Sequence, residues 1–126
     1  MARKKSFTLE FAFRASPNIL FGFLTTPSGL AQWFADMVDV EDGTYTFTWS
    51  GDEEHAVLIE KNEPELARFR WLEGPDNEFF EFKIIQSEVT GDTILFITDF
   101  AEEGELEEQQ LLWSSQIANL QTRIGG

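Results

Sequence analysis

The chain is expected to fold as an α+β domain in which a curved antiparallel sheet of about six or seven strands wraps around a long C-terminal helix. Three features of its 126 residues predict this arrangement. Apolar and polar residues alternate through most of the middle of the chain, which is typical of half-buried strands. The turns between these segments are too short for parallel crossovers. The last segment repeats apolar residues at helical spacing, and such a helix is expected to cover the concave face of the sheet.

The N-terminal segment is expected to contain one strand and two short helices. Residues 1–5 form a loose basic terminus, after which Phe7, Leu9, Phe11 and Phe13 alternate with other residues. Ser16-Pro17 ends this strand, because serine is a favoured N-cap and proline is favoured at the first helical position. Thr26-Pro27 repeats the pair, and a proline disfavours helix at the residue before it. Two short helices are therefore predicted within residues 17–34.

A meander of strands is expected next. The predicted strands cover residues 34–40, 44–49, 54–61, 67–72, 78–85 and 93–100, separated by turns rich in Gly, Pro, Asn and Asp. Their alternation places six aromatic residues on the inner face: Phe47, Trp49, Phe69, Trp71, Phe80 and Phe82.

The C-terminal segment is the longest predicted helix. Leu106, Trp113 and Leu120 recur every seven residues, and Ile117 and Ile124 fill the offset positions. Glutamates crowd its first turn, where the helix dipole favours negative charge. Arg123 and Gly125 suit its C-terminal end.

Composition excludes several classes of function. The formal net charge is −14, which argues against nucleic acid and against an anionic membrane surface as partners. There is no cysteine, so no disulfide framework, thiolate nucleophile or cysteine-ligated zinc site is predicted. No apolar run approaches the length of a membrane span or of a signal-peptide core. We expect one domain over residues 1–126, in a soluble cytoplasmic protein.

Specific residues add a family resemblance. The segments Ser16-Pro17-Asn18-Ile19-Leu20-Phe21 and Thr26-Pro27-Ser28-Gly29-Leu30-Ala31-Gln32-Trp33-Phe34, followed by Leu112-Trp113 in the last helix, carry it. With them the chain resembles the START-like (SRPBCC) superfamily, and within it the branch related to the activator of Hsp90 ATPase. The resemblance covers Phe7 to Ile124 and implies a helix-grip fold and a bacterial protein. Members of this superfamily include lipid carriers, cyclases and co-chaperones, so the resemblance leaves function open.

Three functions follow as hypotheses. The leading one is a non-catalytic module that binds a small hydrophobic molecule between the sheet and the C-terminal helix, without a cofactor. Pockets for such molecules are mostly apolar. Its expected lining is Phe47, Trp49, Phe69, Trp71, Phe80, Phe82, Trp113, Ile117 and Leu120. The second is an interaction module with a partner of chaperone type. The third is a cyclase or hydrolase, although few polar residues are predicted to face inward.

Other groups of polar residues are expected to be ordinary surface side chains. His55, the only histidine, lacks the companions that catalysis or metal binding requires. The glutamates of residues 102–108 spread around a helix start and do not converge on a cation. Asp36, Asp39 and Asp42 do not share a face, and Arg68 and Arg70 are expected to pair with surface acids rather than to bind an anion. No catalytic residue and no metal site is predicted.

Overall fold

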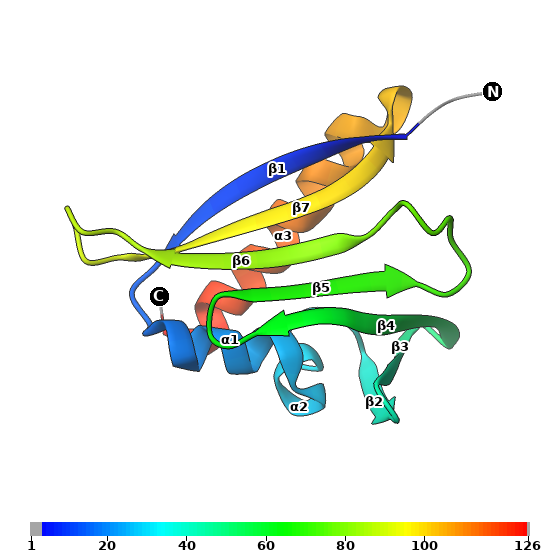
Figure 1. Ribbon diagram of the computed structural model, residues 1–126, viewed down its shortest axis with the longest axis horizontal. Coiled ribbons are helices and arrows are strands. Elements are labelled where there is room, and N and C mark those ends of the chain that lie inside the picture. The colour runs from blue at the N-terminus through cyan, green and yellow to red at the C-terminus, as the bar shows by residue number, and fades with distance from the viewer. Residues whose placement is uncertain (1–3, 126) are drawn as a thin grey trace.

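The structure is a computed structural model that describes residues 4–125, and its centre is a seven-stranded antiparallel sheet. The order of strands across the sheet is β1-β7-β6-β5-β4-β3-β2, and one long helix lies against the concave face (Figure 1). The strands are β1 (Lys4–Phe13), β2 (Met37–Glu41), β3 (Thr44–Trp49), β4 (Asp52–Asn62), β5 (Leu66–Trp71), β6 (Phe80–Gln86) and β7 (Thr93–Glu102). The helices are α1 (Pro17–Thr25), α2 (Pro27–Leu30) and α3 (Leu106–Ile124), preceded by a 3-10 turn, Glu103–Glu105. The predicted α+β helix-grip fold is confirmed.

The two short helices begin where the sequence predicts them. The Ser16 hydroxyl accepts a hydrogen bond from the Ile19 N–H at 3.3 Å, and the Thr26 hydroxyl accepts one from the Gly29 N–H at 3.0 Å. Each cap residue is followed by a proline at the first helical position. The Thr26 hydroxyl also donates to the Gly22 carbonyl at 2.7 Å, which joins the end of α1 to the start of α2.

Helix α3 presents a narrow apolar stripe to the sheet. Trp113, Ile117 and Leu120 are buried on it, and Gly125 closes the helix in the left-handed conformation, with φ of 90°. Leu106, at the first helical position, is 36% exposed, so the stripe is buried from Trp113 onward. No helix within residues 4–125 combines the length and the apolar character that crossing a bilayer requires.

Aromatic rings form most of the core. The rings of Phe69 and Phe80 stack at 4.8 Å between centroids, and Tyr45 meets Phe69 edge-on at 5.1 Å. The Tyr45 hydroxyl donates a 2.6 Å hydrogen bond to the Thr25 carbonyl, which lies at the end of α1 and has no partner within its helix. Among the described residues, no buried side-chain polar atom lacks a hydrogen bond. The interior near α1 is therefore closely packed, and its buried polar side-chain atoms are hydrogen-bonded.

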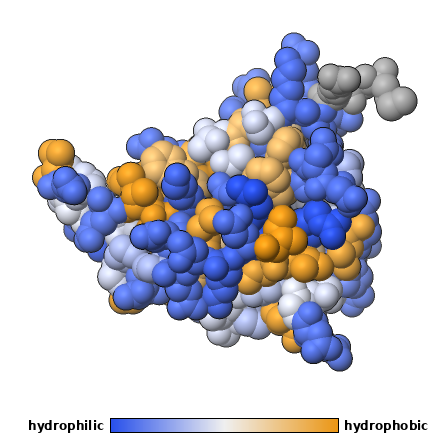
Figure 2. Space-filling view, viewed as in Figure 1, coloured by the Kyte–Doolittle hydropathy of each residue, from blue (hydrophilic) through white to orange (hydrophobic). Residues whose placement is uncertain are grey.

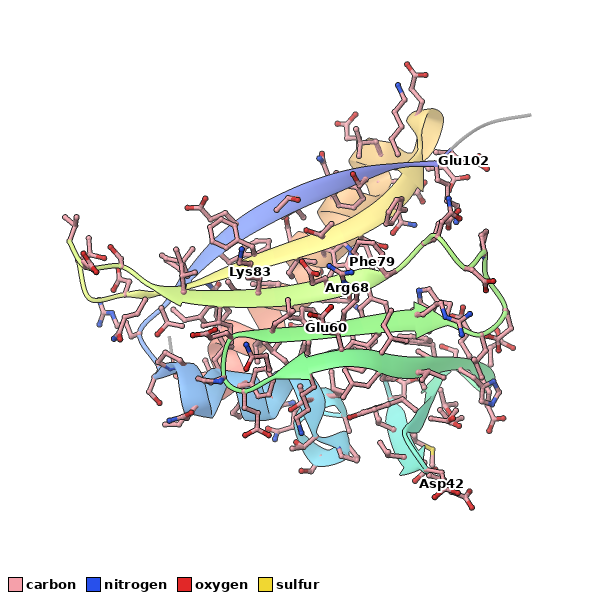
Figure 3. The ribbon with its side chains drawn as sticks, in the orientation of Figure 1. Asp42, Glu60, Arg68, Phe79, Lys83 and Glu102 are labelled. Carbon is pink, nitrogen blue, oxygen red and sulfur yellow. The ribbon has the colours of Figure 1, made fainter. Side chains whose placement is uncertain are left out.

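The outer face of the sheet is largely hydrophilic, with a few separate hydrophobic areas (Figure 2). Arg68 lies on this face among acidic neighbours (Figure 3). Its guanidinium donates to Glu81 Oε1 at 2.6 and 2.8 Å, and its Cζ lies 4.3 Å from the centre of the Phe79 ring. Arg70 bonds Asp76 at 2.8 Å. Both arginines thus pair with acids, as expected for surface charges.

The structure differs from the sequence-based prediction at the N-terminus. Residues 1–5 were expected to be loose, but Lys4 and Lys5 belong to β1 and pair with Glu102 and Ala101 of β7. Strand β7 extends two residues beyond its predicted end, so backbone partners exist for both lysines. Residues 1–3 lie outside the described part of the chain.

A second difference concerns Phe34. The sequence predicts a strand from Phe34, whereas β2 begins at Met37. The Phe34 N–H bonds the Leu30 carbonyl at 2.8 Å, in the turn that ends α2, and sheet pairing starts only with the Asp36 N–H on the Thr48 carbonyl. Phe34 is consequently free to point its ring inward, where it is 5% exposed.

Candidate functional site

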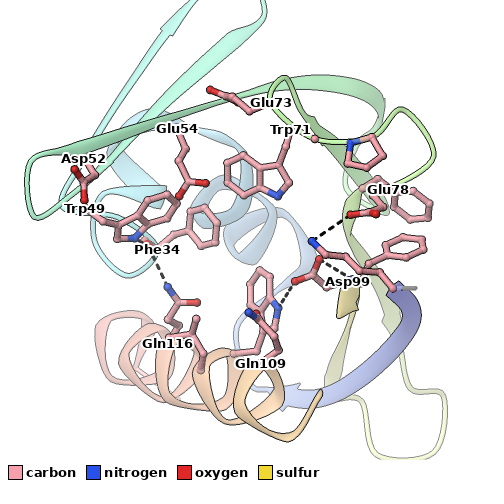
Figure 4. Close-up of a pocket in the computed structure, with 17 residues that line it drawn as sticks. Phe34, Trp49, Asp52, Glu54, Trp71, Glu73, Glu78, Asp99, Gln109 and Gln116 are labelled. Carbon is pink, nitrogen blue, oxygen red and sulfur yellow. Dashed lines mark hydrogen bonds and ion pairs between the residues drawn. The ribbon is translucent and has the colours of Figure 1, made fainter. Parts of the chain in front are cut away.

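A cavity of about 590 Å³ opens at the end of the sheet opposite α1, between the sheet and the first half of α3 (Figure 4). The β3–β4 hairpin, the end of β5 with the loop after it, the end of β7 and helix α3 all contribute to its wall. Its lining residues are Lys4, Phe34, Trp49, Asp52, Glu54, Trp71, Glu73, Gly74, Pro75, Glu78, Phe79, Asp99, Phe100, Gln109, Leu112, Trp113 and Gln116.

Phe34 is at the centre of the aromatic part of this wall. Its ring stacks with the Trp113 ring at 5.7 Å between centroids and with the Phe80 ring beneath at the same distance. It meets the Trp49 ring edge-on at 5.4 Å. Trp71 contacts the same group from β5, 4.9 Å from Phe80. Phe34, Trp49, Trp71 and Trp113 therefore form one group of aromatic side chains in the cavity wall, supported from below by core rings. Phe79 and Phe100 complete the six aromatic residues of the lining.

Hydrogen bonds hold the orientation of two of these tryptophans. The Trp49 indole N–H donates to the Phe34 carbonyl at 2.7 Å, and the Trp113 indole N–H donates to Asp99 Oδ2 at 2.9 Å. The Gln116 amide donates to the same Phe34 carbonyl at 3.1 Å, which ties α3 to the loop after α2. Both indole N–H groups are thus satisfied by the protein itself. The wall is formed in advance of any ligand.

Asp99 is the most enclosed carboxylate of the cavity. It follows Leu95 and Ile97 on the inner face of β7, where the alternation places it opposite α3. Burial raises the pKa of the Asp99 carboxyl, and the hydrogen bonds from Trp113 and from the Phe100 N–H oppose that rise. Burying a carboxylate at this position costs desolvation free energy. Asp99 therefore belongs to the cavity wall and not to the apolar core.

The remaining charged groups of the wall lie around the opening. Asp52 and Glu54 come from β4, and Glu73 and Glu78 come from the segment between β5 and β6. Lys4 is the one basic residue of the lining in the described part of the chain, and its Nζ lies 3.4 Å from Glu78. The opening is therefore acidic around an aromatic interior.

His55 lies beside this opening without lining the cavity. Its Nδ1 is 2.9 Å from Glu73 Oε1, and its side chain is 37% exposed. The hydrogen bond from His55 lowers the pKa of Glu73. No nucleophile accompanies the pair in the described contacts, which suits the expected role of a surface residue.

The structure separates the nine predicted lining residues into two groups. Three of them, Trp49, Trp71 and Trp113, line the cavity. The other six do not reach it: Phe47, Phe69, Phe80, Phe82, Ile117 and Leu120 are at most 1% exposed and form the packed core beneath. Their side chains point to the inner face of the sheet or from α3 toward it, as the sequence pattern predicts. They lie further from the cavity opening, where the aromatic rings of the core interdigitate.

Sequence reasoning did not select Phe34, Asp99 or Glu54 for the site. Two of them carried a signal in the alternation. Asp99 interrupts an inward apolar series on β7, and Glu54 falls on the inner face of β4, since it pairs with the buried Phe47 across the hairpin. Phe34 carried none, because its position depends on where α2 ends.

The remaining acidic groups do not converge on a site. Glu102 closes β7, and the glutamates after it occupy the 3-10 turn and the first turn of α3. Asp36 accepts a hydrogen bond from the Ser50 N–H at 2.8 Å, and Asp42 lies in the exposed turn between β2 and β3 (Figure 3). Within residues 4–125, no three histidine, aspartate or glutamate side chains are grouped as metal ligands.

Comparisons with known proteins place this geometry in a family. A family model described as a START-like superfamily domain matches residues 1–126. BfR322 from Bacteroides fragilis, solved in solution, is 37% identical over 98% of this chain and 92% of that chain, with a TM-score of 0.69. None of the curated protein sequences matches significantly.

Two further solved structures share the fold at low sequence identity. The Aha1 dimer from Colwellia psychrerythraea is 15% identical over 95% of this chain and 96% of that chain, with a TM-score of 0.82. CalU16 from Micromonospora echinospora is 18% identical over 96% of this chain and 76% of that chain, with a TM-score of 0.74. These likenesses concern the fold alone. The one to Aha1 agrees with the branch that the sequence resembles.

Proposed function

The chain belongs to the START-like superfamily, and we propose that it is a non-catalytic module that binds a small molecule with an apolar body in the cavity between the sheet and α3. One observation carries the proposal: a cavity of about 590 Å³ whose aromatic wall is already held in place by hydrogen bonds. Small-molecule sites are typically concave, of a few hundred to about a thousand Å³, and largely formed before the ligand arrives.

A binding role fits the polar groups of the cavity better than catalysis does. The indole N–H groups of Trp49 and Trp113 and the Gln116 amide are already engaged by the protein. Asp99 is the one enclosed acid, and it accepts two hydrogen bonds from its own surroundings. A general acid or base would need a second reactive group within hydrogen-bond reach of the same substrate atom. Among the described acids of the cavity, Asp99 is held by Trp113 and the Phe100 N–H, and Glu78 is held by Lys4.

The proposal can be tested with Nile red, a neutral hydrophobic dye, and with native mass spectrometry of the purified protein. We expect the dye to bind with increased fluorescence. If the protein retains a molecule through purification, we expect native mass spectrometry to detect it and the dye to compete with it. Gln109→Phe places a ring in the cavity and should weaken dye binding by about tenfold, equivalent to roughly 1.4 kcal/mol. Leu111→Phe is the matched control, since Leu111 is 66% exposed on the same helix and does not line the cavity.

Two results would contradict this function. One is a protein that carries no molecule and binds no hydrophobic probe. The other is dye binding that Gln109→Phe and Leu111→Phe affect equally, which would place the dye elsewhere. The alternative hypothesis, an interaction module with a partner of chaperone type, would then take its place, and stimulation of an Hsp90 ATPase is its direct test.

A further inference from the structure

The cavity combines an aromatic wall with a strong imbalance of charge. Among residues 4–125, five carboxylates line it, from Asp52, Glu54, Glu73, Glu78 and Asp99, against the single ammonium group of Lys4. That ammonium already lies 3.4 Å from Glu78. The imbalance has the same sign as the whole chain, whose formal net charge is −14, so the potential at the opening is negative.

Three of these acids have no ion pair within residues 4–125. They are Asp52, Glu54 and Asp99, whereas Glu81 and Asp76 pair with Arg68 and Arg70. Asp99 is in addition enclosed by the wall, and burial raises the pKa of its carboxyl although two hydrogen bonds and the nearby charge of Lys4 oppose that rise. Positive charge supplied by a ligand would offset the desolvation cost of this carboxylate.

The aromatic part of the wall favours the same kind of ligand. The electron-rich face of an aromatic ring attracts an organic cation that lies within about 6 Å of the ring centre, and tryptophan does so best. Three of the six aromatic side chains in the lining are indoles, those of Trp49, Trp71 and Trp113. In Figure 4 the Glu54 carboxylate points toward the space beside Phe34 and Trp71, so a negative group accompanies the rings.

A metal ion does not suit this arrangement. The carboxylates are distributed around the opening on β4, on the segment after β5 and on β7. No three acidic or histidine side chains of the described chain are grouped closely enough to act as ligands. Hard cations need several oxygen ligands at 2–2.6 Å, whereas an ammonium group on an apolar body needs only diffuse negative potential and ring faces.

We propose that the molecule held in this cavity is an organic ammonium ion with an apolar body, bound by the rings of Trp49, Trp71 and Trp113 and by the acids around them. The proposal rests on the proposed function and specifies its ligand. It also excludes fatty acids and other apolar anions, because they would place a carboxylate against five others, with one lysine in compensation among the residues that the structure describes.

Three probes with a common phenylbutyl body separate charge from apolar contact. They are 4-phenylbutylamine, which is positive at pH 7, 4-phenylbutan-1-ol, which is neutral, and 4-phenylbutyrate, which is negative. Binding is measured by isothermal titration calorimetry and by the fluorescence of the tryptophans in the wall. We expect the amine to bind about tenfold more tightly than the alcohol, and the butyrate to bind more weakly than both.

A matched pair of variants then locates the charge that matters. Glu54→Gln removes one negative charge from the cavity, and Glu53→Gln removes one from the neighbouring exposed position of β4, which does not line it. Both variants change the net charge equally. The ratio of amine affinity to alcohol affinity should fall at least about threefold in Glu54→Gln and should stay at the parent value in Glu53→Gln.

The outcomes distinguish the two proposals. If the alcohol binds as tightly as the amine, or the butyrate binds most tightly, the ammonium proposal is wrong while a binding function stands. If both variants lower the ratio equally, the preference comes from the overall charge of the protein and the assignment to this cavity is wrong. If none of the three probes binds while Nile red does, the ammonium proposal is wrong and the binding function stands. If Nile red also fails to bind and the protein retains no molecule, both are overturned.

Discussion

The indole N–H of Trp113 donates a 2.9 Å hydrogen bond to the carboxylate of Asp99, joining the middle of α3 to the end of β7. The two residues come from elements that the chain connects through a 3-10 turn. Their contact fixes how the first half of α3 lies over the sheet. It also places an acid and an indole side by side in the cavity wall.

Asp99 should make the stability of the protein depend on pH. Because burial raises the pKa of its carboxyl, the folded state holds the proton more tightly than the unfolded state does. As pH rises from about 3.9, the ordinary value for aspartate, through the raised pKa of the folded state, the contribution of Asp99 to the free energy of unfolding falls.

Asp99→Asn removes this dependence and keeps an oxygen that accepts from Trp113. The free energy of unfolding of the variant, relative to the parent, should therefore increase between about pH 4 and pH 7. Urea denaturation at a series of pH values measures it. Asp92→Asn, in the turn before β7, is the matched control for the loss of one carboxylate. A difference between variant and parent that is constant with pH would contradict the prediction.

Trp113 should be among the residues on which the fold depends most. It is 5% exposed and contacts Phe34, Phe80 and Phe82. Trp113→Ala should cost roughly 3–5 kcal/mol, because it leaves a void and removes the hydrogen bond to Asp99. Leu111→Ala, on the exposed side of α3, should stay within about 0.5 kcal/mol of the parent. Thermal unfolding checks both; a Trp113→Ala melt within about two degrees of the parent would contradict this role.

Gly29 should not tolerate a side chain. A Cβ there would lie 2.6 Å from Phe23 Cα and in closer overlap with the Gly22 carbonyl oxygen. Both are backbone atoms, so α2 would have to move away from α1, and Gly29→Ala should cost roughly 1–3 kcal/mol. Gly22→Ala meets nothing within 4 Å and should be neutral or stabilising by up to about 1 kcal/mol. Equal stability of the two variants in urea denaturation would show that the helices are not in contact as described.

The protein should not bind DNA or RNA. Its net charge of −14 opposes a polyanion, and the two arginines of the outer face are engaged by acids. At ~150 mM salt no gel shift is expected with micromolar protein, with a basic DNA-binding protein as the positive control. A shift that disappears as salt rises would refute this expectation.

The order and type of the elements could be predicted from local patterns. Ser16-Pro17 and Thr26-Pro27 mark helix starts because capping and proline geometry involve only neighbouring residues. The alternation in β3 to β7 correctly predicts the inner face, since side chains of a strand alternate with a period of two. The stripe of α3 follows from its helical period in the same way.

The position of the cavity could not be predicted in this way. A period tells which face a residue occupies, but not which residues of other strands lie at the same end of the sheet. That depends on strand pairing: β1 joins β7, and the hairpin of β3 and β4 carries Trp49, Asp52 and Glu54 to the far end from α1. Six of the nine predicted lining residues therefore lie in the core instead.

The sequence by itself determined the strand segments and their inner faces, two proline-started helices and an amphipathic C-terminal helix, because each depends on a pattern among near neighbours in the chain. Only the tertiary structure decided that the inner face is apolar toward α1 and acidic at the opposite end. Asp99 and Glu54 meet the rings of Phe34, Trp71 and Trp113 there because the sheet curves around α3 and brings separate strands to one opening. Such convergence arises from long-range pairing and packing, which no local pattern encodes.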